Sequence, residues 1–397
     1  MTRLALIISL VFLVACSPKN EDPQSNQKTQ KMIDSRAFAA QVGIVAYTSL
    51  SDANQAAQSF DSKLASFMYH PNPMSQTEIQ QAWRKAYDSF LSSLIFSYLP
   101  IQDPPDWYSQ EIDYQNLLMQ LDSWPIEGGY IDHIEGYPFS GIVNDLTLNI
   151  DEETIRSQHG FTDPSNASLG YHALEFMLWG GNGERSAPDF FPQENTAPIP
   201  LSDEEHAAGT ANTAQIEPVE TQDIKTQNHN RRRQYTQLLS ELLQKDLHRI
   251  QRRWEPSSGY YAQLLQQSNA ENTLQAAFIA AQDLISKELL NKRFQLISSE
   301  FSKTSNDDLL ALLSGMEQWF MPEEAEQQEA SLFFLMQQAD SNIADEFAAS
   351  LQQSLSCISK MTAASADIDQ CKQDTISLLS NLRNAAISLS VELPSLD

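Results

Sequence analysis

The sequence predicts an all-α fold built from two packed helical-bundle domains. Apolar residues recur at helical spacing along most of the chain, whereas patterns typical of strands are rare. Amphipathic helices bury their apolar sides by packing against one another, and bundles are the usual result. We expect an N-terminal helical domain at residues 32–230 and a C-terminal helical-bundle domain at residues 231–397.

The first well-marked helix is expected to begin near residue 75. Ser75 and Glu78 have the spacing of a capping box, and Met74 and Ile79 have that of a hydrophobic staple. The apolar residues that follow keep to one helical face: Ile79, Trp83, Phe90 and Leu94. We interpret this stripe as a side of the helix that faces the core.

Further apolar stripes predict the helices of the second half. They run over residues 238–254, 274–289, 309–320 and 343–358. Asp307 and Asp308 lie at the start of the third stripe, where the helix dipole favours negative charge. A last helix is expected from near Cys371 to about Leu389.

Residues 1–15 have the pattern of a bacterial lipoprotein signal peptide, with Arg3 ahead of an apolar stretch too short to cross a membrane. The stretch ends at Cys16 in a pattern that resembles the lipobox, so acyl chains are expected on this cysteine. Residues 16–31 are polar and are expected to form a flexible tether. The protein is therefore predicted to be lipid-anchored in the cell envelope, and Ser17 favours the outer membrane over the inner one.

The overall charge argues against one class of partner. The chain has 397 residues, with 52 Asp and Glu against 25 Lys and Arg, and a net charge of −27. Because phosphate binding requires a basic surface, no nucleic-acid partner is expected. An acidic surface instead concentrates cations around the protein.

The cysteines predict a disulfide. Once Cys16 is lipidated, Cys357 and Cys371 remain, and an oxidising compartment makes such a pair a disulfide candidate. A closed loop of about 15 residues would contribute roughly 3 kcal/mol in the chain-entropy account. A cysteine–metal site is less favoured, because the spacing is long and no histidine lies nearby.

Two segments interrupt the helical pattern. Residues 122–150 are rich in Gly and Pro turns, and the segment is long enough to indicate a function rather than a simple connection. The residues from about 184 to 230 are polar and poor in apolar side chains, which predicts a mobile surface insertion.

The main chemical signal lies on a short helix predicted between these segments. His172 and Glu175 are three residues apart and therefore share a helical face. An imidazole and a carboxylate at this spacing can bind one divalent ion. The spacing also fits a His–Glu hydrogen bond alone, because two residues do not complete a metal site. Other donors are present elsewhere in the chain: Glu127, Asp132, His133, Asp246 and His248.

Hydrolase signatures are incomplete in this sequence. Zinc peptidases of the inverted type use His-x-x-Glu-His, but Phe176 stands where the second histidine is required. Neither a His-Glu-x-x-His motif nor a Gly-x-Ser-x-Gly motif is present. A hydrolytic site would therefore need ligands from distant helices.

The motifs resemble those of the imelysin family over the chain from about residue 35 to its end. Gly170, His172 and Glu175 match the Gly-x-His-x-x-Glu motif of that family. Other blocks resemble the family in the same order along the chain: Trp124-Pro125, Tyr130-Ile131-Asp132, Gly141-Ile142-Val143-Asn144, Gly183 with Arg185, Arg231 through Trp254, Glu300-Phe301-Ser302 and Gly315. Two positions depart from the pattern, since Gly128 replaces a frequent acidic residue and Tyr87 replaces a frequent arginine.

The resemblance implies two bundle-like helical domains with a site near their interface, and a role linked to iron or other metal ions at the cell envelope. The first hypothesis is therefore an envelope protein that binds a divalent or ferric ion, iron or zinc, in iron uptake or sensing. His172 and Glu175 would be ligands, with Glu127 and Asp132 as further candidates. Its partners would be the membrane, the metal ion and envelope components of iron transport.

Two other hypotheses remain open. One is a metallopeptidase of the imelysin type, with Glu175 or Glu127 as the general base. The other is a metal-free module that holds a peptide or small ligand near Trp124, Tyr130 and Trp179.

Overall fold

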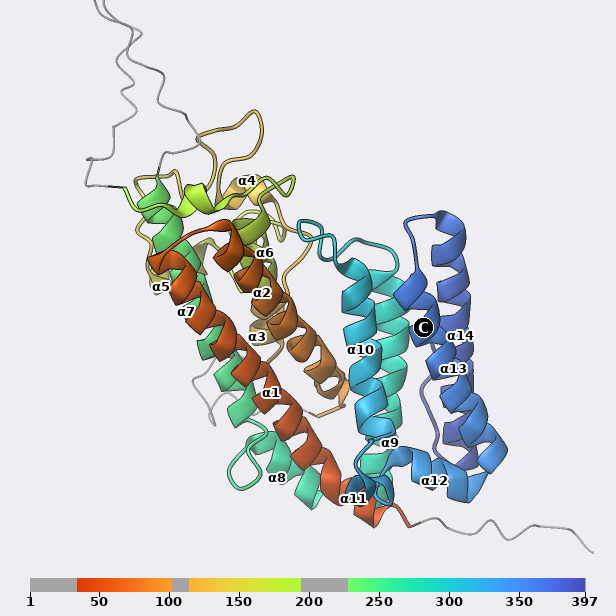
Figure 1. Ribbon diagram of the computed structural model, residues 1–397. Coiled ribbons are helices and arrows are strands. Elements are labelled where there is room, and N and C mark those ends of the chain that lie inside the picture. Colours follow the sequence, from red (N-terminus) through yellow and green to blue (C-terminus); the bar gives the residue numbers. More distant parts are fainter. Residues whose placement is uncertain (1–33, 102–113, 194–227, 397) are drawn as a thin grey trace, which may run out of the picture. The chain divides into compact units, whose positions relative to one another are not determined.

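The computed structural model describes residues 34–101, 114–193 and 228–396 (Figure 1). The predicted signal peptide, Cys16, the tether and most of the expected polar insertion lie outside these ranges and stay predictions. Within the described ranges, no helix combines the length and the apolar character needed to cross a membrane.

The all-α prediction is confirmed. Regular structure in the described residues is helical, apart from one isolated bridge between Ile134 and Tyr137. The first part of the chain forms α1 (Arg36–Tyr69), α2 (Pro73–Ser93), η1 (Leu94–Tyr98), α3 (Tyr114–Leu121), α4 (Gly128–Ile131), α5 (Glu152–Gln158), α6 (Gly170–Trp179) and η2 (Ala187–Phe190). The second part forms α7 (His229–Arg252), α8 (Tyr260–Gln267), α9 (Ala270–Asp283), η5 (Leu284–Arg293), α10 (Ser305–Phe320), α11 (Ala325–Gln328), α12 (Leu332–Ala339), α13 (Ser341–Lys360) and α14 (Ser365–Ser388).

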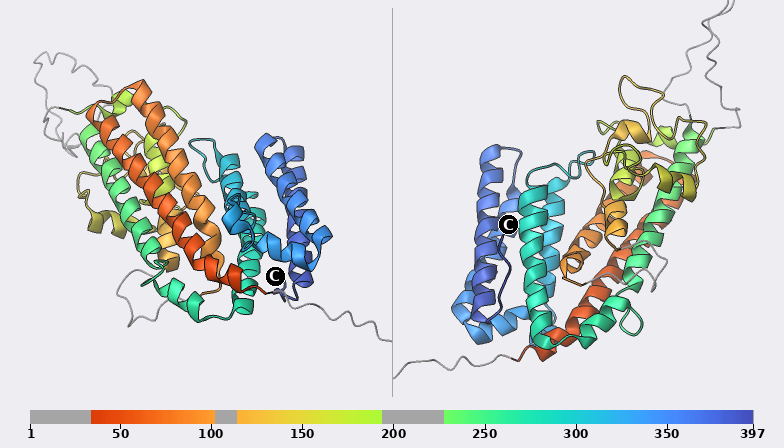
Figure 2. Two further views of the ribbon diagram at one scale, coloured as in Figure 1. Left: turned by 60° about the horizontal axis from the view of Figure 1, so that its bottom comes forward. Right: turned by 180° about the vertical axis from the view of Figure 1, so that it is seen from behind.

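The helices form two groups that meet at α2 and α10. In the first group α1 packs along both α2 and α7, and the short α6 lies against α2 and α7 (Figure 1). In the second group α13 and α14 lie side by side, with α14 against α9 and α13 against α10 (Figure 2). Because α10 also packs against α2, the described residues form a single compact unit. The division into domains at residue 231 stays a prediction.

The start of α2 differs from the predicted one. The helix begins at Pro73, and the side-chain oxygen of the N-cap Asn72 accepts hydrogen bonds from the N–H groups of Met74 and Ser75. The Ser75 hydroxyl in turn accepts the N–H of Asn72. The predicted pairing of Ser75 with Glu78 is therefore wrong, because the Asn-Pro pair already supplies a cap and a first helical residue. The apolar stripe of this helix is confirmed as buried: Ile79, Trp83, Phe90 and Leu94.

The helix predicted over residues 274–289 changes its pitch partway. After α9 ends at Asp283, the chain continues as the π-helix η5. Residues five apart then lie on one face, so Arg293 donates a hydrogen bond from Nε to Glu288 Oε1 at 2.6 Å. Such wide turns are rare and often occur at functional sites. The apolar periodicity of the sequence did not indicate this change.

The predicted disulfide is confirmed. Cys357 of α13 and Cys371 of α14 are bonded, and the bridge joins two helices that already pack along each other. It therefore reinforces the outer pair of helices in the second group.

At Gly315, helix α10 lies directly against the backbone of α2. A Cβ atom at this position would lie 2.1 Å from the carbonyl oxygen of Ser92. The Ser92 hydroxyl also donates a hydrogen bond to the carbonyl oxygen of Ala311, one turn earlier in α10, at 3.1 Å. The two groups of helices can therefore meet in this way only because residue 315 has no side chain.

Replacing Gly315 by Ala is expected to lower the free energy of unfolding by roughly 1–3 kcal/mol, because α2 and α10 must move apart. A matched control is Gly43→Ala in α1, where a new Cβ would meet neighbours only at 3.8 Å or more. That change is expected to be neutral or stabilising, because Ala favours a helix over Gly. Urea unfolding followed by circular dichroism measures both variants, and an unchanged stability for Gly315→Ala would contradict this account of the packing.

Candidate functional site

The candidate site is centred on α6, the helix that carries the His-x-x-Glu pair. Gly170 opens the helix with a φ of +88°, and a Cβ there would lie 2.3 Å from the carbonyl oxygen of Gln120. A glycine is therefore required for α6 to enter so close to the end of α3. The helix ends at Gly180, which has a φ of +74°. His172 and Glu175 are almost completely buried, at 1 % and 0 % exposed.

Both nitrogens of the His172 ring have carboxylate or hydroxyl partners. Nδ1 lies 2.8 Å from Oε2 of Glu175. Nε2 lies 2.9 Å from the Tyr87 hydroxyl and 3.3 Å from Oδ1 of Asp122. The predicted proximity of His172 and Glu175 is therefore confirmed, and two further groups join them from α2 and from the end of α3.

Glu175 holds the imidazole in place instead of pointing into open space. Its Oε2 accepts from His172, and its Oε1 accepts from the Ser302 N–H at 2.8 Å and from the Ser302 hydroxyl at 2.6 Å. Phe301 packs edge-to-face on Phe176, with ring centroids 5.1 Å apart, and helps to seat this segment on α6. Both carboxylate oxygens of Glu175 are thus engaged, which fits a residue that orients the ring.

A buried arginine lies next to the histidine. Arg293, at the end of η5, donates from one terminal nitrogen to the Tyr87 oxygen at 3.1 Å, and its other terminal nitrogen pairs with Oδ2 of Asp122 at 2.5 Å. Its Nε donates to Glu288. The Arg293 side chain is fully buried. All five N–H donors of a guanidinium need partners when buried, and these carboxylates supply most of them.

The hydrogen-bond pattern makes His172 a cation. The single proton of Tyr87 is donated to Oδ1 of Asp122 at 2.6 Å, so the Tyr87 oxygen accepts from Arg293 and from Nε2 of His172. Nδ1 faces a carboxylate and must donate as well. Burial alone would lower the pKa of His172, but the hydrogen bonds to Asp122 and Glu175 outweigh it and raise the pKa to about 9.

The neighbouring groups keep the charges that this arrangement requires. Burial would raise the pKa of Asp122, but the Arg293 guanidinium holds it far below the usual range of a carboxyl group. Burial raises the pKa of Tyr87 well above its usual value, so the phenol stays neutral. The cluster therefore contains ionised Asp122, cationic Arg293 and cationic His172 around a neutral hydroxyl.

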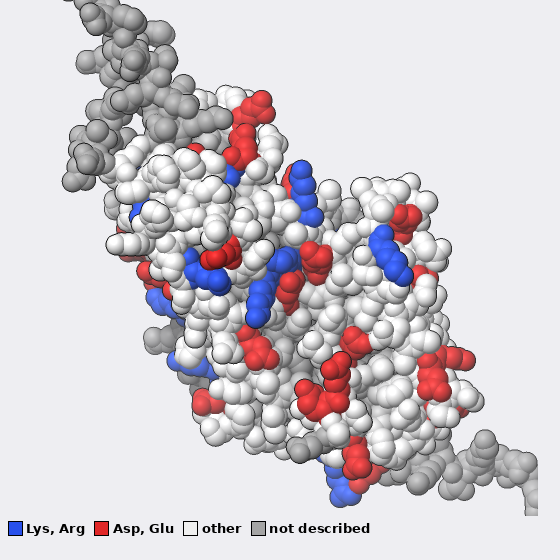
Figure 3. Space-filling model, viewed as in Figure 1, with Lys and Arg blue, Asp and Glu red and all other residues white. Residues whose placement is uncertain are grey.

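The charged cluster extends from α6 to the contact between α2 and α10. Arg84 of α2 donates to Oδ1 of Asp308 in α10 at 2.7 Å, and also contacts Asp88. Oδ2 of Asp308 accepts from the hydroxyls of Ser298 and Ser299. Figure 3 shows basic and acidic side chains side by side near the middle of this face, over α2 and α10. Asp308, predicted only as a first-turn residue, is thus also an ion-pair partner across the two helix groups.

The other candidate ligands lie elsewhere. Asp132 is fully buried between the guanidinium groups of Arg185 and Arg232, at 3.0 and 2.6 Å, and also contacts His133. These partners hold the pKa of Asp132 well below its usual range in spite of burial. Asp132 and Arg185 therefore form a separate ion cluster, and the structure gives no contact between Asp132 and His172 within the described residues.

The remaining candidate metal ligands do not contact His172 either. Glu127 is an exposed residue at the start of α4. Asp246 pairs with Arg156 and Arg249, at 2.9 Å in each case. His248 is an exposed residue of α7. None of the three has a described contact with His172.

The aromatic residues singled out from the sequence have different surroundings. Trp124 lies beside the site, with its ring centroid 6.4 Å from that of His172 and with Lys292 and Arg293 over its face at 4.5 and 5.0 Å. The Tyr130 hydroxyl instead donates to the carbonyl oxygen of Gln158. Trp124 therefore belongs to the site and Tyr130 to the loop packing around it.

Sequence reasoning did not identify three central groups, namely Tyr87, Asp122 and Arg293. Tyr87 was marked only as a departure from the family pattern, yet its hydroxyl links His172, Asp122 and Arg293. Its spacing of four from Trp83 was a usable signal, because both residues then share the buried face of α2. Arg293 had no signal, since its position depends on the π-helical turn.

The three donor atoms on the Nε2 side fit one face of a metal coordination shell. His172 Nε2, the Tyr87 oxygen and Asp122 Oδ1 are 2.6 to 3.3 Å from one another. Donors about 2.1 Å from an ion lie roughly 2.9–3.4 Å apart at octahedral or tetrahedral angles. The two distances from Nε2 are in this range, whereas the hydrogen-bonded pair of Tyr87 and Asp122, at 2.6 Å, would have to open slightly. Within the described ranges, no three His, Cys, Asp or Glu side chains converge on one point, so the fit depends on Tyr87 as the third donor.

Comparison with known proteins gives the family of this chain. A model of the imelysin family, described as imelysin of the peptidase M75 class, matches residues 46–386. The chain therefore belongs to the imelysin family. No curated protein gives a significant match to it.

Two solved structures resemble this one. The first is a Parabacteroides distasonis ATCC 8503 protein provisionally assigned as an iron-regulated protein A precursor, with a TM-score of 0.61 and 13% identity over 90% of this chain and 96% of that one. The second is an imelysin-like protein from Psychrobacter arcticum 273-4, with a TM-score of 0.57 and 13% identity over 91% and 99%. At this identity the likeness shows a shared fold.

Removal of the buried arginine tests the charge balance of the site. Arg293→Met is expected to lower the free energy of unfolding by about 3–5 kcal/mol, because Asp122 and Glu288 would remain buried without their cation. The control is Lys287→Met in the same helix, which removes an exposed pair with Asp283 and is expected to cost less than about 1 kcal/mol. Denaturant unfolding measures both, and equal small losses would contradict the assigned role of Arg293.

Proposed function

We propose that this imelysin-family protein is a lipid-anchored envelope protein that binds a divalent or ferric metal ion, iron or zinc, at His172. One observation carries the proposal, which is the hydrogen bond from Nδ1 of His172 to Glu175. A histidine that binds a metal through one nitrogen usually donates the other N–H to a carboxylate or carbonyl group. Glu175, itself held by Ser302, supplies that carboxylate and directs Nε2 toward the other donors.

The ion would be held by His172 Nε2, Asp122 and Tyr87. This assignment revises the expected roles, since Glu175 becomes the residue that orients the ligand and Asp122 supplies the carboxylate ligand. Nitrogen, carboxylate and phenol oxygens suit iron or zinc better than they suit calcium. When bound, the ion would bring a Lewis-acidic charge into a site that is otherwise closed to solvent.

The proton on His172 competes with the ion for Nε2. With a pKa of about 9, the ring holds both protons at neutral pH, so binding of the ion must release one of them. Metal affinity is therefore expected to rise with pH between 7 and 9. Arg293 neutralises the other oxygen of Asp122 and limits the charge available to the ion.

A metal-binding role in iron uptake or sensing is favoured over a role as a metallopeptidase. The Parabacteroides protein of similar fold is described as iron-regulated, which supports an iron-linked role. Envelope components of iron transport would be the partners in such a role. A general base must contact a water molecule or a substrate. Both carboxylate oxygens of Glu175 are already hydrogen-bonded to protein groups, and Glu127 has no described contact with His172. An anchor at Cys16, at the outer membrane, would keep the site where metal ions enter the cell.

Calorimetric titration with ferrous, ferric and zinc ions tests the proposal. His172→Gln is expected to abolish binding, and Glu175→Gln to weaken it by about 10–100-fold, because the second residue only orients the first. The matched control is His70→Gln, which alters an exposed histidine after α1 and is expected to bind like the wild type. Equal affinity in wild type and His172→Gln would exclude this site.

A further inference from the structure

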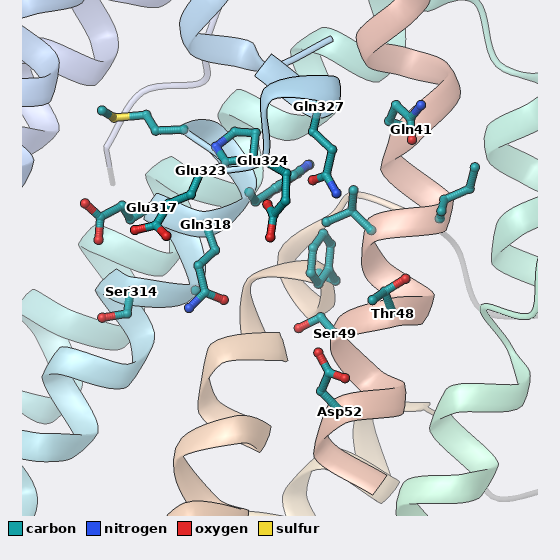
Figure 4. A pocket seen from close by; sticks show the side chains of 17 residues that line it. Gln41, Thr48, Ser49, Asp52, Ser314, Glu317, Gln318, Glu323, Glu324 and Gln327 are labelled. Carbon is teal, nitrogen blue, oxygen red and sulfur yellow. The ribbon is translucent and has the colours of Figure 1, made fainter. Parts of the chain in front are cut away.

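A cavity lies away from the histidine cluster, between α1 and the end of α10. Its volume is about 490 Å³, which is within the range of small-ligand pockets. One wall is formed by α1 and the other by α10 and the segment that follows it, and the labelled side chains face one another across the gap (Figure 4). It shares no lining residue with the His172 site.

The cavity is lined by negative charges and by no positive ones. The charged residues that line it are all acidic: Asp52, Glu317, Glu323 and Glu324. Red side chains gather over this part of the surface, between α1 and α10, with no blue ones among them (Figure 3). Glu317 accepts a hydrogen bond from Gln352, whereas Asp52, Glu323 and Glu324 have no ion pair with any described residue. The cavity therefore favours a cationic ligand.

The inner wall of the cavity is aromatic and contains an unused hydrogen-bond donor. Phe96 and Trp319 line it, with ring centroids 4.8 Å apart. Trp319 is only 4 % exposed, yet its indole N–H donates to no residue in the described part of the chain. The ring is buried but its nitrogen is accessible, so the N–H can donate to an oxygen of a ligand in the cavity. The ring face can also attract a cationic group.

A single metal ion does not fit these observations. The described acidic residues of the cavity do not converge as a group that could hold one ion. They are spread over α1, α10 and the segment after it, and the amide side chains of Gln41, Gln318 and Gln327 also line the cavity (Figure 4). Spaced carboxylates, amides and an indole donor instead match an extended ligand with both amine and carbonyl groups.

We infer that this cavity binds a short basic peptide segment, with a lysine or arginine side chain among the carboxylates. The cationic head would pair with Asp52 and Glu324, while its aliphatic stem lies along Phe96. The indole of Trp319 would donate to a peptide carbonyl oxygen, and the glutamine amides would pair with the peptide backbone. The inference is independent of metal binding at His172.

The test uses the purified full-length chain and N-acetylated, C-amidated Ala-Lys-Ala in calorimetric titration, with blocked Ala-Met-Ala as the neutral peptide. The lysine peptide is expected to bind and the methionine peptide is not. Asp52→Asn combined with Glu324→Gln should weaken binding at least about tenfold, and both side chains are exposed, so the fold is preserved. The matched control is Glu241→Gln, an exposed acid of α7 outside the cavity.

A second variant separates a peptide from a simple amine. Trp319→Phe keeps one aromatic ring but removes the pyrrole ring with its N–H, so it should weaken the lysine peptide severalfold and leave spermidine, which has no oxygen, unaffected. Equal binding of both peptides, no loss in the double variant, or binding of MgCl₂ alone would each overturn the inference. Metal titration of the same double variant should match the wild type, so failure here is distinguishable from failure at His172.

Discussion

Buried charges must be balanced, and this requirement organises the centre of the molecule. Arg293 and His172 are cations without access to solvent, and each is stabilised by one carboxylate of its own helix and by Asp122 from the end of α3. Asp122 lies between the two cations, and Tyr87 provides the one hydroxyl that links them. Loss of any one partner would leave an uncompensated charge in a medium where such charges are costly. The site therefore also holds together the elements that carry these residues.

Several local features of the fold place these charged residues together. The π-helical turn of η5 brings Glu288 and Arg293 onto one face of the helix. Because Gly315 has no side chain, α10 can pack directly against the backbone of α2. Arg84 and Asp308 then pair across this same contact. Arg293 lies 3.7 Å from Asp308, so the charges around His172 continue into the contact between the two helix groups.

The sequence predicted the helices better than the side-chain contacts between them. Helical periodicity and the cysteine pair could be read from the sequence, and both are confirmed. Glu175 was expected to be a ligand because spacing places it beside His172, but spacing does not reveal that Ser302 occupies its other oxygen. Arg293 could not be anticipated, because Asp122 and Tyr87 come from distant elements and Glu288 reaches it only through the π-helical turn. Asp132 looked equally suitable until its two arginine partners were known.

The protonation state of His172 is the central claim, because it fixes both the charge balance and the competition with a metal ion. Nitrogen-15 NMR of the metal-free protein, with His172 assigned through His172→Gln, measures it directly. We expect both ring nitrogens to carry protons at pH 7, with one lost only as the pH approaches about 9, and added zinc to shift Nε2 while Nδ1 keeps its proton. A neutral ring at pH 7, or a metal bound through Nδ1, would contradict the account.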